Sequence, residues 1–147
     1  MVTLDPSVAG AAHAEDRLRR DEMIWITTVR ADGQPQSSAV WFHWDGTDFL
    51  LVSQPGAAKV RNLAANPRVS LTLNGTGIGA DLVIVEGRAE VLPDHASAPW
   101  PEAARIDAYY AKYETALRDV LQSSATDMAA AFTTALRITP TRWRVTP

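Results

Sequence analysis

The sequence predicts a mostly β fold with peripheral helices, built on six antiparallel strands that form a closed or split barrel. The expected strands follow one another through short turns and do not alternate with helices, which excludes a doubly wound α/β sheet. Strands joined by short turns are antiparallel, because parallel neighbours need long crossover connections. Residues 68–73 and 81–92 also alternate apolar with polar side chains, a pattern typical of a sheet with one buried face.

The composition indicates one globular domain over residues 1–147. Hydrophobic residues make up 46% and charged residues 21%, and the net charge of -3 argues against a nucleic-acid-binding protein. The lack of cysteine excludes disulfides, thiolate chemistry and Cys-type zinc sites. No apolar run approaches the roughly 20 residues that span a bilayer, and the N-terminus lacks the pattern of a signal peptide. We therefore expect a cytoplasmic protein without a membrane partner.

The first elements are expected to be a helix and three strands. Asp5 and Pro6 have the character of an N-cap and a first helical residue, which predicts a helix that runs to about Arg20. Its apolar side consists of Val8, Ala11, Ala12 and Leu18. Strands joined by Asp-Gly hairpin turns are then predicted over residues 23–29, 36–44 and 48–53.

The rest of the chain combines further strands with helices. A short basic helix is expected before Asn66-Pro67, and strands are expected over 68–73 and 81–92. Apolar residues then recur at helical spacing between Trp100 and Leu121, namely Ile106, Tyr109, Tyr110, Tyr113, Leu117, Val120 and Leu121. Thr126 or Asp127 is expected to cap a helical turn or two over 128–133, which makes 100–133 a helical insertion. The last strand has two pieces, 135–139 and 143–145, interrupted or bent at Pro140.

The basic helix and its flanks predict an anion site. Ser53, Lys59, Arg61 and Asn62 cluster around a helix N-terminus. Such a terminus leaves backbone N–H groups unpaired, and the helix dipole favours an anion there. A helix with an ordinary solvated basic face is the alternative that this segment leaves open.

Several familiar motifs are absent or misleading. The segment GTGIGA (75–80) imitates a dinucleotide-binding fingerprint, but a strand follows where that motif needs a helix. We interpret these glycines as a flexible loop, with close approach to a flat ligand or a partner subunit as a weaker alternative. His13, His43 and His95 show no metal-binding spacing, and no serine lies in a nucleophile elbow, so neither a metal site nor a hydrolase is predicted.

Five tryptophans are many for a chain of 147 residues. They suit core and dimer-interface packing, or a flat apolar wall against a tricyclic ring. Trp41 is the best candidate for such a wall, because it lies one strand before the basic turn. We expect a hairpin to bring Trp41 and that turn side by side.

Together these residues resemble the split β-barrel flavin and deazaflavin family. This superfamily includes pyridoxamine phosphate oxidase and its actinobacterial relatives that use the deazaflavin coenzyme F420. The resemblance covers about residues 14–93 and returns at RITPTRWRV (137–145). It is carried, in order, by DGQPQSSAVWFHWDG, S-Q-P-G-x-x-K-x-R-N-L-x-x-N-P-R-V-S-L, DLVIVEGRAEV and ITPTR.

The resemblance implies an FMN-binding split-barrel fold and a homodimer with two cofactor sites at the subunit interface. Lys59 would contact the cofactor phosphate, and Asn62 would instead tie the helix to the sheet. Trp143 and the loop around Gly77 would come from the partner subunit. The full set of candidate cofactor-binding residues is Ser38, Ala39, Val40 and Trp41 at the ring, then Ser53, Gln54, Ala57, Ala58, Lys59 and Arg61 at the phosphate, with Asn62 on the same helix, Gly77 and Trp143.

Two departures from the family pattern bear on the cofactor. Many relatives carry a second basic residue where this chain has Ala57, a role that Arg61 would have to take. The insertion at 100–133 is also unlike the oxidase that makes pyridoxal phosphate, and we find no equivalent of that enzyme's substrate-phosphate clamp. Both the insertion and the missing clamp favour F420 over vitamin B6 chemistry.

The expected function is therefore an F420-dependent reductase that transfers hydride to an unsaturated small organic acceptor. A cofactor that does the bond-making explains why no catalytic constellation is visible in the sequence. The proton donor would be solvent, His43 or Tyr110. Three alternatives remain: an FMN-dependent oxidoreductase of the same fold, a non-catalytic carrier of the coenzyme, and a small interaction domain without a cofactor.

Overall fold

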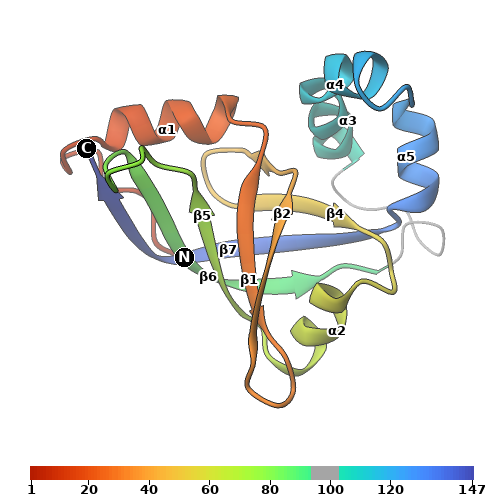
Figure 1. The fold of residues 1–147 in the computed structure, drawn as a ribbon, viewed down its shortest axis with the longest axis horizontal. Coiled ribbons are helices and arrows are strands. Elements are labelled where there is room, and N and C mark those ends of the chain that lie inside the picture. The colour runs from red at the N-terminus through yellow and green to blue at the C-terminus, as the bar shows by residue number, and fades with distance from the viewer. Residues whose placement is uncertain (94–102) are drawn as a thin grey trace.

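A computed structural model describes residues 1–93 and 103–147. Within these residues a single antiparallel sheet of seven strands, in the order β2-β1-β5-β6-β7-β4-β3, curls into a half-barrel (Figure 1). The strands are β1 (Ile24–Val29), β2 (Pro35–Val40), β3 (His43–Trp44), β4 (Phe49–Ser53), β5 (Arg68–Leu73), β6 (Leu82–Val91) and β7 (Thr134–Thr146). The helices are α1 (Ala11–Arg20), α2 (Ala58–Ala65), α3 (Ala103–Lys112), α4 (Glu114–Asp119) and α5 (Ala125–Ala131). The mostly β split-barrel prediction holds, with seven strands in place of six.

The extra strand arises because the predicted strand 36–44 breaks at Phe42. The Phe42 N–H donates to the Tyr113 hydroxyl at 2.9 Å, and the Phe42 carbonyl accepts from Lys112 Nζ at 3.0 Å. Side chains of the helical insertion thus take the backbone groups that a ladder would otherwise use. β2 consequently pairs with β1, whereas β3 pairs with β4 at the opposite end of the sheet order.

The last strand is continuous, which corrects the prediction of two pieces. β7 pairs with β6 from Leu136 to Thr146, but Glu86 faces Arg142 while Gly87 faces Pro140. Thr141 is the extra residue of a bulge, and a bulge bends and twists a strand locally. Proline has no N–H to donate to a ladder, and it is tolerated beside a bulge because the ladder is locally disrupted there. The predicted bend near Pro140 is therefore present without an interruption.

Gly87 lies opposite this bulge and cannot carry a side chain without a rearrangement. A Cβ at this position would come within 2.9 Å of both Ile138 Cγ2 and the Thr139 carbonyl oxygen. We expect Gly87→Ala to lower the free energy of unfolding by about 1–3 kcal/mol in urea titrations. Gly77→Ala, where a Cβ meets nothing within 4 Å, is the matched control and should unfold like wild type. Equal stability of the two variants would contradict the predicted overpacking.

The barrel core lies on one face of the sheet. Its fully buried members include Ile24, Ile26, Phe42, Phe49, Leu51, Leu71, Leu73, Val85, Leu136 and Ile138. The predicted apolar face of β6 is buried at Val83, Val85, Gly87 and Ala89 but is exposed at Val91. Charged residues of β6 lie on the opposite, exposed face, as predicted.

The first helix begins later than predicted. α1 starts at Ala11, after Gly10 adopts a left-handed φ of +86° that ends the preceding turn. Asp5 does not cap the helix, because its carboxylate accepts from the Ser7 N–H at 2.9 Å in a local turn. Val8 and Ala12 are exposed, and the buried face of α1 consists of Ala11, Ala14, Arg17 and Leu18.

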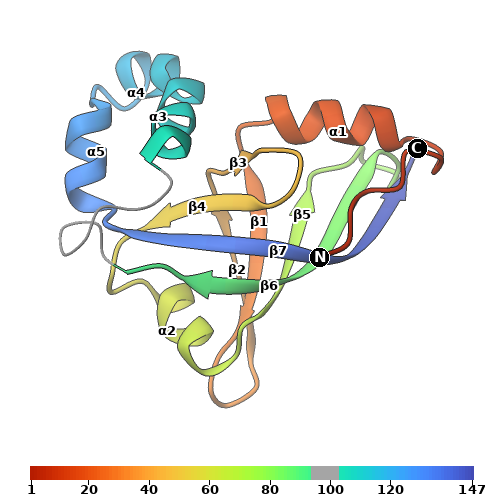
Figure 2. The ribbon, with the colours of Figure 1, turned by 180° about the vertical axis from the view of Figure 1, so that it is seen from behind.

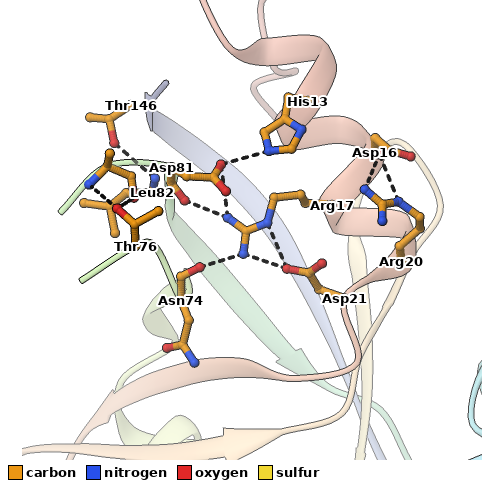
Figure 3. A network of polar contacts seen from close by, with 11 residues as sticks. His13, Asp16, Arg17, Arg20, Asp21, Asn74, Thr76, Asp81, Leu82 and Thr146 are labelled. Atoms are coloured by element: carbon orange, nitrogen blue, oxygen red, sulfur yellow. Dashed lines mark hydrogen bonds and ion pairs between the residues drawn. The ribbon is translucent and has the colours of Figure 1, made fainter. Parts of the chain in front are cut away.

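Arg17 ties α1 to both ends of the 75–80 loop (Figure 3). Its guanidinium donates to the Asn74 and Asp81 carbonyls, each at 2.6 Å, and to the Asp21 carboxylate at 2.7 Å. His13 Nε2 also lies 3.1 Å from the Asp81 carboxylate. One buried cation therefore satisfies two backbone carbonyls of a loop and an acid of its own helix.

The helical insertion differs from the predicted single helix over 100–121. Tyr113 separates α3 from α4, and Val120 and Leu121 are exposed. α5 is capped by the Ser124 hydroxyl, which accepts from the Asp127 N–H at 3.1 Å, and not by Thr126 or Asp127. The predicted positions His95 and Trp100 lie outside the described residues. α3, α4 and α5 gather at one end of the molecule, away from α1 (Figures 1 and 2).

Candidate functional site

The predicted anion site lies at the start of α2, directly after β4. Ala57 is the N-cap residue, and no side chain caps the helix. The first N–H groups of α2 therefore have no side-chain acceptor, which leaves them suited to an anion. The Ser53 hydroxyl is buried and donates to the Gln54 carbonyl at 3.3 Å, and the Gln54 side chain is exposed.

Lys59 projects from this first turn into a cavity. Its ammonium is half-buried and makes no hydrogen bond or ion pair with any residue that the structure describes. Burial lowers the pKa of Lys59 because a desolvated ammonium is disfavoured. The cavity has a volume of about 360 Å³ and is lined by Ala39, Val40, Trp41, Val52, Lys59, Tyr109, Tyr110, Leu121, Met128 and Phe132. The site is thus one cation in a mainly apolar and aromatic wall.

Trp41 belongs to this wall, and the ring of Tyr113 packs against one face of its indole. It stacks on the Tyr113 ring with centroids 4.1 Å apart and planes within 4° of parallel. The Tyr113 hydroxyl in turn accepts from the Phe42 N–H and donates to the Glu22 carbonyl at 2.6 Å. A stacked and anchored indole offers a rigid surface to a ligand.

Trp41 and the basic turn meet as predicted, but not through the predicted hairpin. The end of β2 and Lys59 of α2 line the same cavity, and residues of the helical insertion complete its lining. Tyr109 and Tyr110 of α3 line the cavity from the side of the insertion. Burial raises the pKa of both phenols, most strongly that of Tyr109. The sequence indicates their helical spacing but not the strand that they face.

Two predicted residues have structural partners of their own. The buried Asn62 amide donates to the Thr28 hydroxyl and to the Gln36 side-chain oxygen, each at 2.9 Å, so Asn62 ties α2 to β1 and β2 as expected. Arg61 is exposed and donates to the Gly56 carbonyl. Neither residue lines the cavity, and Ser38 on β2 does not line it either.

Trp143 and Gly77 lie apart from the cavity within this chain. The Trp143 indole packs on Trp44 and Phe49, with centroids 5.5 and 6.2 Å away, and its N–H donates to the Val2 carbonyl. Gly77 lies in the loop that Arg17 holds against α1. Their expected contribution from a partner subunit stays a prediction.

His43 does not line the Lys59 cavity. It lies in a separate cavity with Arg19, Trp44, Ala108 and Lys112. Burial and the nearby Arg105 guanidinium lower the pKa of His43, and burial lowers the pKa of Lys112 to about 8. Of the two candidate proton donors, only Tyr110 lines the Lys59 cavity.

Metal-binding groups and membrane-spanning helices are both absent from the described residues. In them, no group of three or more His, Cys, Asp or Glu side chains is placed to hold a metal ion. None of the helices they form is long and apolar enough to cross a membrane.

Known proteins share this arrangement of strands and helices. The pyridoxamine 5'-phosphate oxidase family matches residues 11–147. The chain belongs to this family. The match confirms the resemblance predicted from the motifs, and it extends through the helical insertion. Pyridoxamine 5'-phosphate oxidase-like proteins form a superfamily of flavin and deazaflavin oxidoreductases, to which the chain is thereby assigned.

Solved structures of this family and fold give a closer comparison. An F420 reductase is 27% identical, with a TM-score of 0.67 over 88% of this chain and 94% of its own. A conserved hypothetical protein from Mycobacterium tuberculosis is 24% identical, with a TM-score of 0.70 over 98% of this chain and 88% of its own. The heme storage protein HutZ from Vibrio cholerae is 17% identical, with a TM-score of 0.69 over 99% of this chain and 96% of its own. The last two comparisons support the fold only.

Proposed function

We propose that this protein is an F420-dependent oxidoreductase that transfers hydride from the reduced coenzyme to an unsaturated small organic acceptor. The observation that carries the proposal is the half-buried Lys59 ammonium, which has no partner among the described residues in a mainly apolar and aromatic cavity. An unpaired, desolvated cation is costly, so its position favours an anionic ligand. Similarity to an F420 reductase supports this choice of coenzyme.

The residues around Lys59 fit both ends of such a coenzyme. The Lys59 ammonium and the uncapped first turn of α2, at Ala57 and Ala58, would bind its phosphate. Trp41, with Ala39 beside it, would bind the planar ring. Hydride transfer is the chemistry that the coenzyme supplies when bound, while the protein orients its ligands and excludes water.

We also propose a cytoplasmic homodimer in which each cofactor site lies at the subunit interface. Trp143 and Gly77 do not line the Lys59 cavity of their own chain, so a contact between them and a bound cofactor would come from a second copy. The Lys59 cavity is correspondingly one wall of a larger site. The family resemblance supports this arrangement.

Lys59→Met is expected to weaken F420 binding by about 1.5–3 kcal/mol, because it removes a charge-assisted contact and keeps the aliphatic stem. This loss corresponds to a dissociation constant that is roughly 10- to 150-fold higher. Fluorescence titration of the coenzyme against each protein measures it. Arg20→Met is the control, since Arg20 lies on α1 outside the cavity lining and pairs with Asp16 on the exposed surface, and it should change the affinity little.

Other results of these binding and activity measurements would favour one of the alternative functions. Wild-type affinity of Lys59→Met would refute the phosphate assignment. A wild-type protein that binds FMN and not F420 would be an FMN-dependent oxidoreductase of the same fold. Tight F420 binding without oxidation of the reduced coenzyme by any member of a panel of enones, quinones and nitroaromatics would indicate a carrier.

A further inference from the structure

Tyr110 carries a polar atom that the fold itself does not use. Its side chain comes from α3, is only 7% exposed and lines the Lys59 cavity. Its hydroxyl oxygen is buried and has no hydrogen-bond partner among the residues that the structure describes. An unpaired buried hydroxyl lowers stability, so its presence requires an explanation.

Two neighbouring tyrosines of the insertion make the contrast clear. The Tyr113 hydroxyl bonds to the backbone of Glu22 and Phe42 and holds the strand break in place. The Tyr109 hydroxyl has a hydrogen bond from the Val52 backbone. Both of these hydroxyls have structural roles, whereas the Tyr110 hydroxyl has none in the described part of the chain.

We propose that the Tyr110 hydroxyl donates a hydrogen bond to a carbonyl oxygen of a planar conjugated ring bound in the Lys59 cavity. This inference rests on the proposed function, which requires such a ring in the site. The ring is that of the coenzyme or that of the acceptor, because deazaflavins, quinones and enones all carry a conjugated carbonyl.

The chemistry of the cavity favours a neutral acceptor atom at Tyr110. Burial raises the pKa of this phenol, so it keeps its proton at neutral pH and can act as a donor. Trp41 and Phe132 offer apolar surface to the faces of a ring, and about 360 Å³ lies within the range of small-molecule sites. Lys59 is available for an anionic group, whereas a second anion beside the apolar wall would remain poorly solvated.

The test compares Tyr110→Phe with Ser7→Ala, which removes an exposed hydroxyl outside the cavity lining, in the full-length protein. F420 is titrated in one arm, and menadione is titrated without coenzyme in the other, with tryptophan fluorescence as the signal. Tyr110→Phe is expected to weaken binding of one of these ligands about 10-fold, the loss of one hydrogen bond, while Ser7→Ala changes both affinities by about twofold or less. Without ligand, the melting temperature of Tyr110→Phe should equal or exceed that of wild type.

The arms separate the two sources of the carbonyl. Weaker F420 binding assigns the contact to the coenzyme ring, and weaker menadione binding alone assigns it to the acceptor. Wild-type affinity of Tyr110→Phe for both ligands would overturn the inference, as would a melting temperature below wild type or a wild-type protein that binds neither ligand. If Lys59→Met loses F420 while Tyr110→Phe does not lose either ligand, this inference fails and the proposed function stands.

Discussion

Replacing Tyr113 with phenylalanine is expected to lower the free energy of unfolding by about 2–4 kcal/mol in urea titrations. The variant keeps the ring that stacks on Trp41, but it loses the acceptor of the Phe42 N–H and the donor to the Glu22 carbonyl. The Phe42 side chain is fully buried, so its amide has little access to water as a replacement. The strand break at Phe42 should therefore loosen, and hydrogen exchange of that amide should accelerate.

Tyr110→Phe is the matched control, because it removes the same atom from the same insertion. The Tyr110 hydroxyl has no partner among the described residues, so the Tyr110→Phe variant should lose no stability. A Tyr113→Phe protein that unfolds at the same urea concentration as Tyr110→Phe would show that the Tyr113 hydroxyl does not hold the break.

Arg17→Met is expected to cost about 3–5 kcal/mol, the largest loss among the substitutions proposed for this chain. Arg17 is 9% exposed and bonds to two backbone carbonyls and to Asp21. Methionine fills much of the same volume but leaves these acceptors without a donor, and the 75–80 loop is then no longer tied to α1. Urea unfolding measures the stability, and hydrogen exchange of the loop amides reports the local release.

Arg20→Met provides the comparison on the same helix. Arg20 pairs with Asp16 on the exposed surface, where solvent and salt screen the interaction. Its replacement should leave the unfolding curve nearly unchanged. Similar losses for Arg17→Met and Arg20→Met would mean that the buried contacts of Arg17 contribute no more than a surface ion pair.

The strands were predictable wherever a local pattern decides them. β5 spans Arg68–Leu73 as predicted, and β6 differs from the prediction by one residue at each end. The break at Phe42 could not be predicted, because its hydrogen-bond partners Lys112 and Tyr113 lie about 70 residues away in the sequence. The late start of α1 follows from the backbone conformation of Gly10, which outweighs the capping signal at Asp5.

The candidate site was predictable in part. Lys59 and Trp41 were identified as candidates from the sequence, and both line one cavity. The cofactor roles of these residues stay predictions. Tyr109 was expected only as part of the apolar side of a helix, and Tyr110 also as a candidate proton donor, because periodicity defines a buried face without naming its contact. The unpartnered Tyr110 hydroxyl could be found only once that contact was known.

The break at Phe42 also marks where the half-barrel is left unclosed. β2 and β3 stand at opposite ends of the sheet order, yet only Trp41 and Phe42 separate them in the chain. Such a link spans no more than about 11 Å, so the two margins of the sheet meet at this seam. Among the described residues no backbone ladder joins these margins, and Tyr113 and Lys112 bind the connecting Phe42 to the helical insertion. Separation of the margins beyond this two-residue link would therefore break no interstrand backbone hydrogen bond.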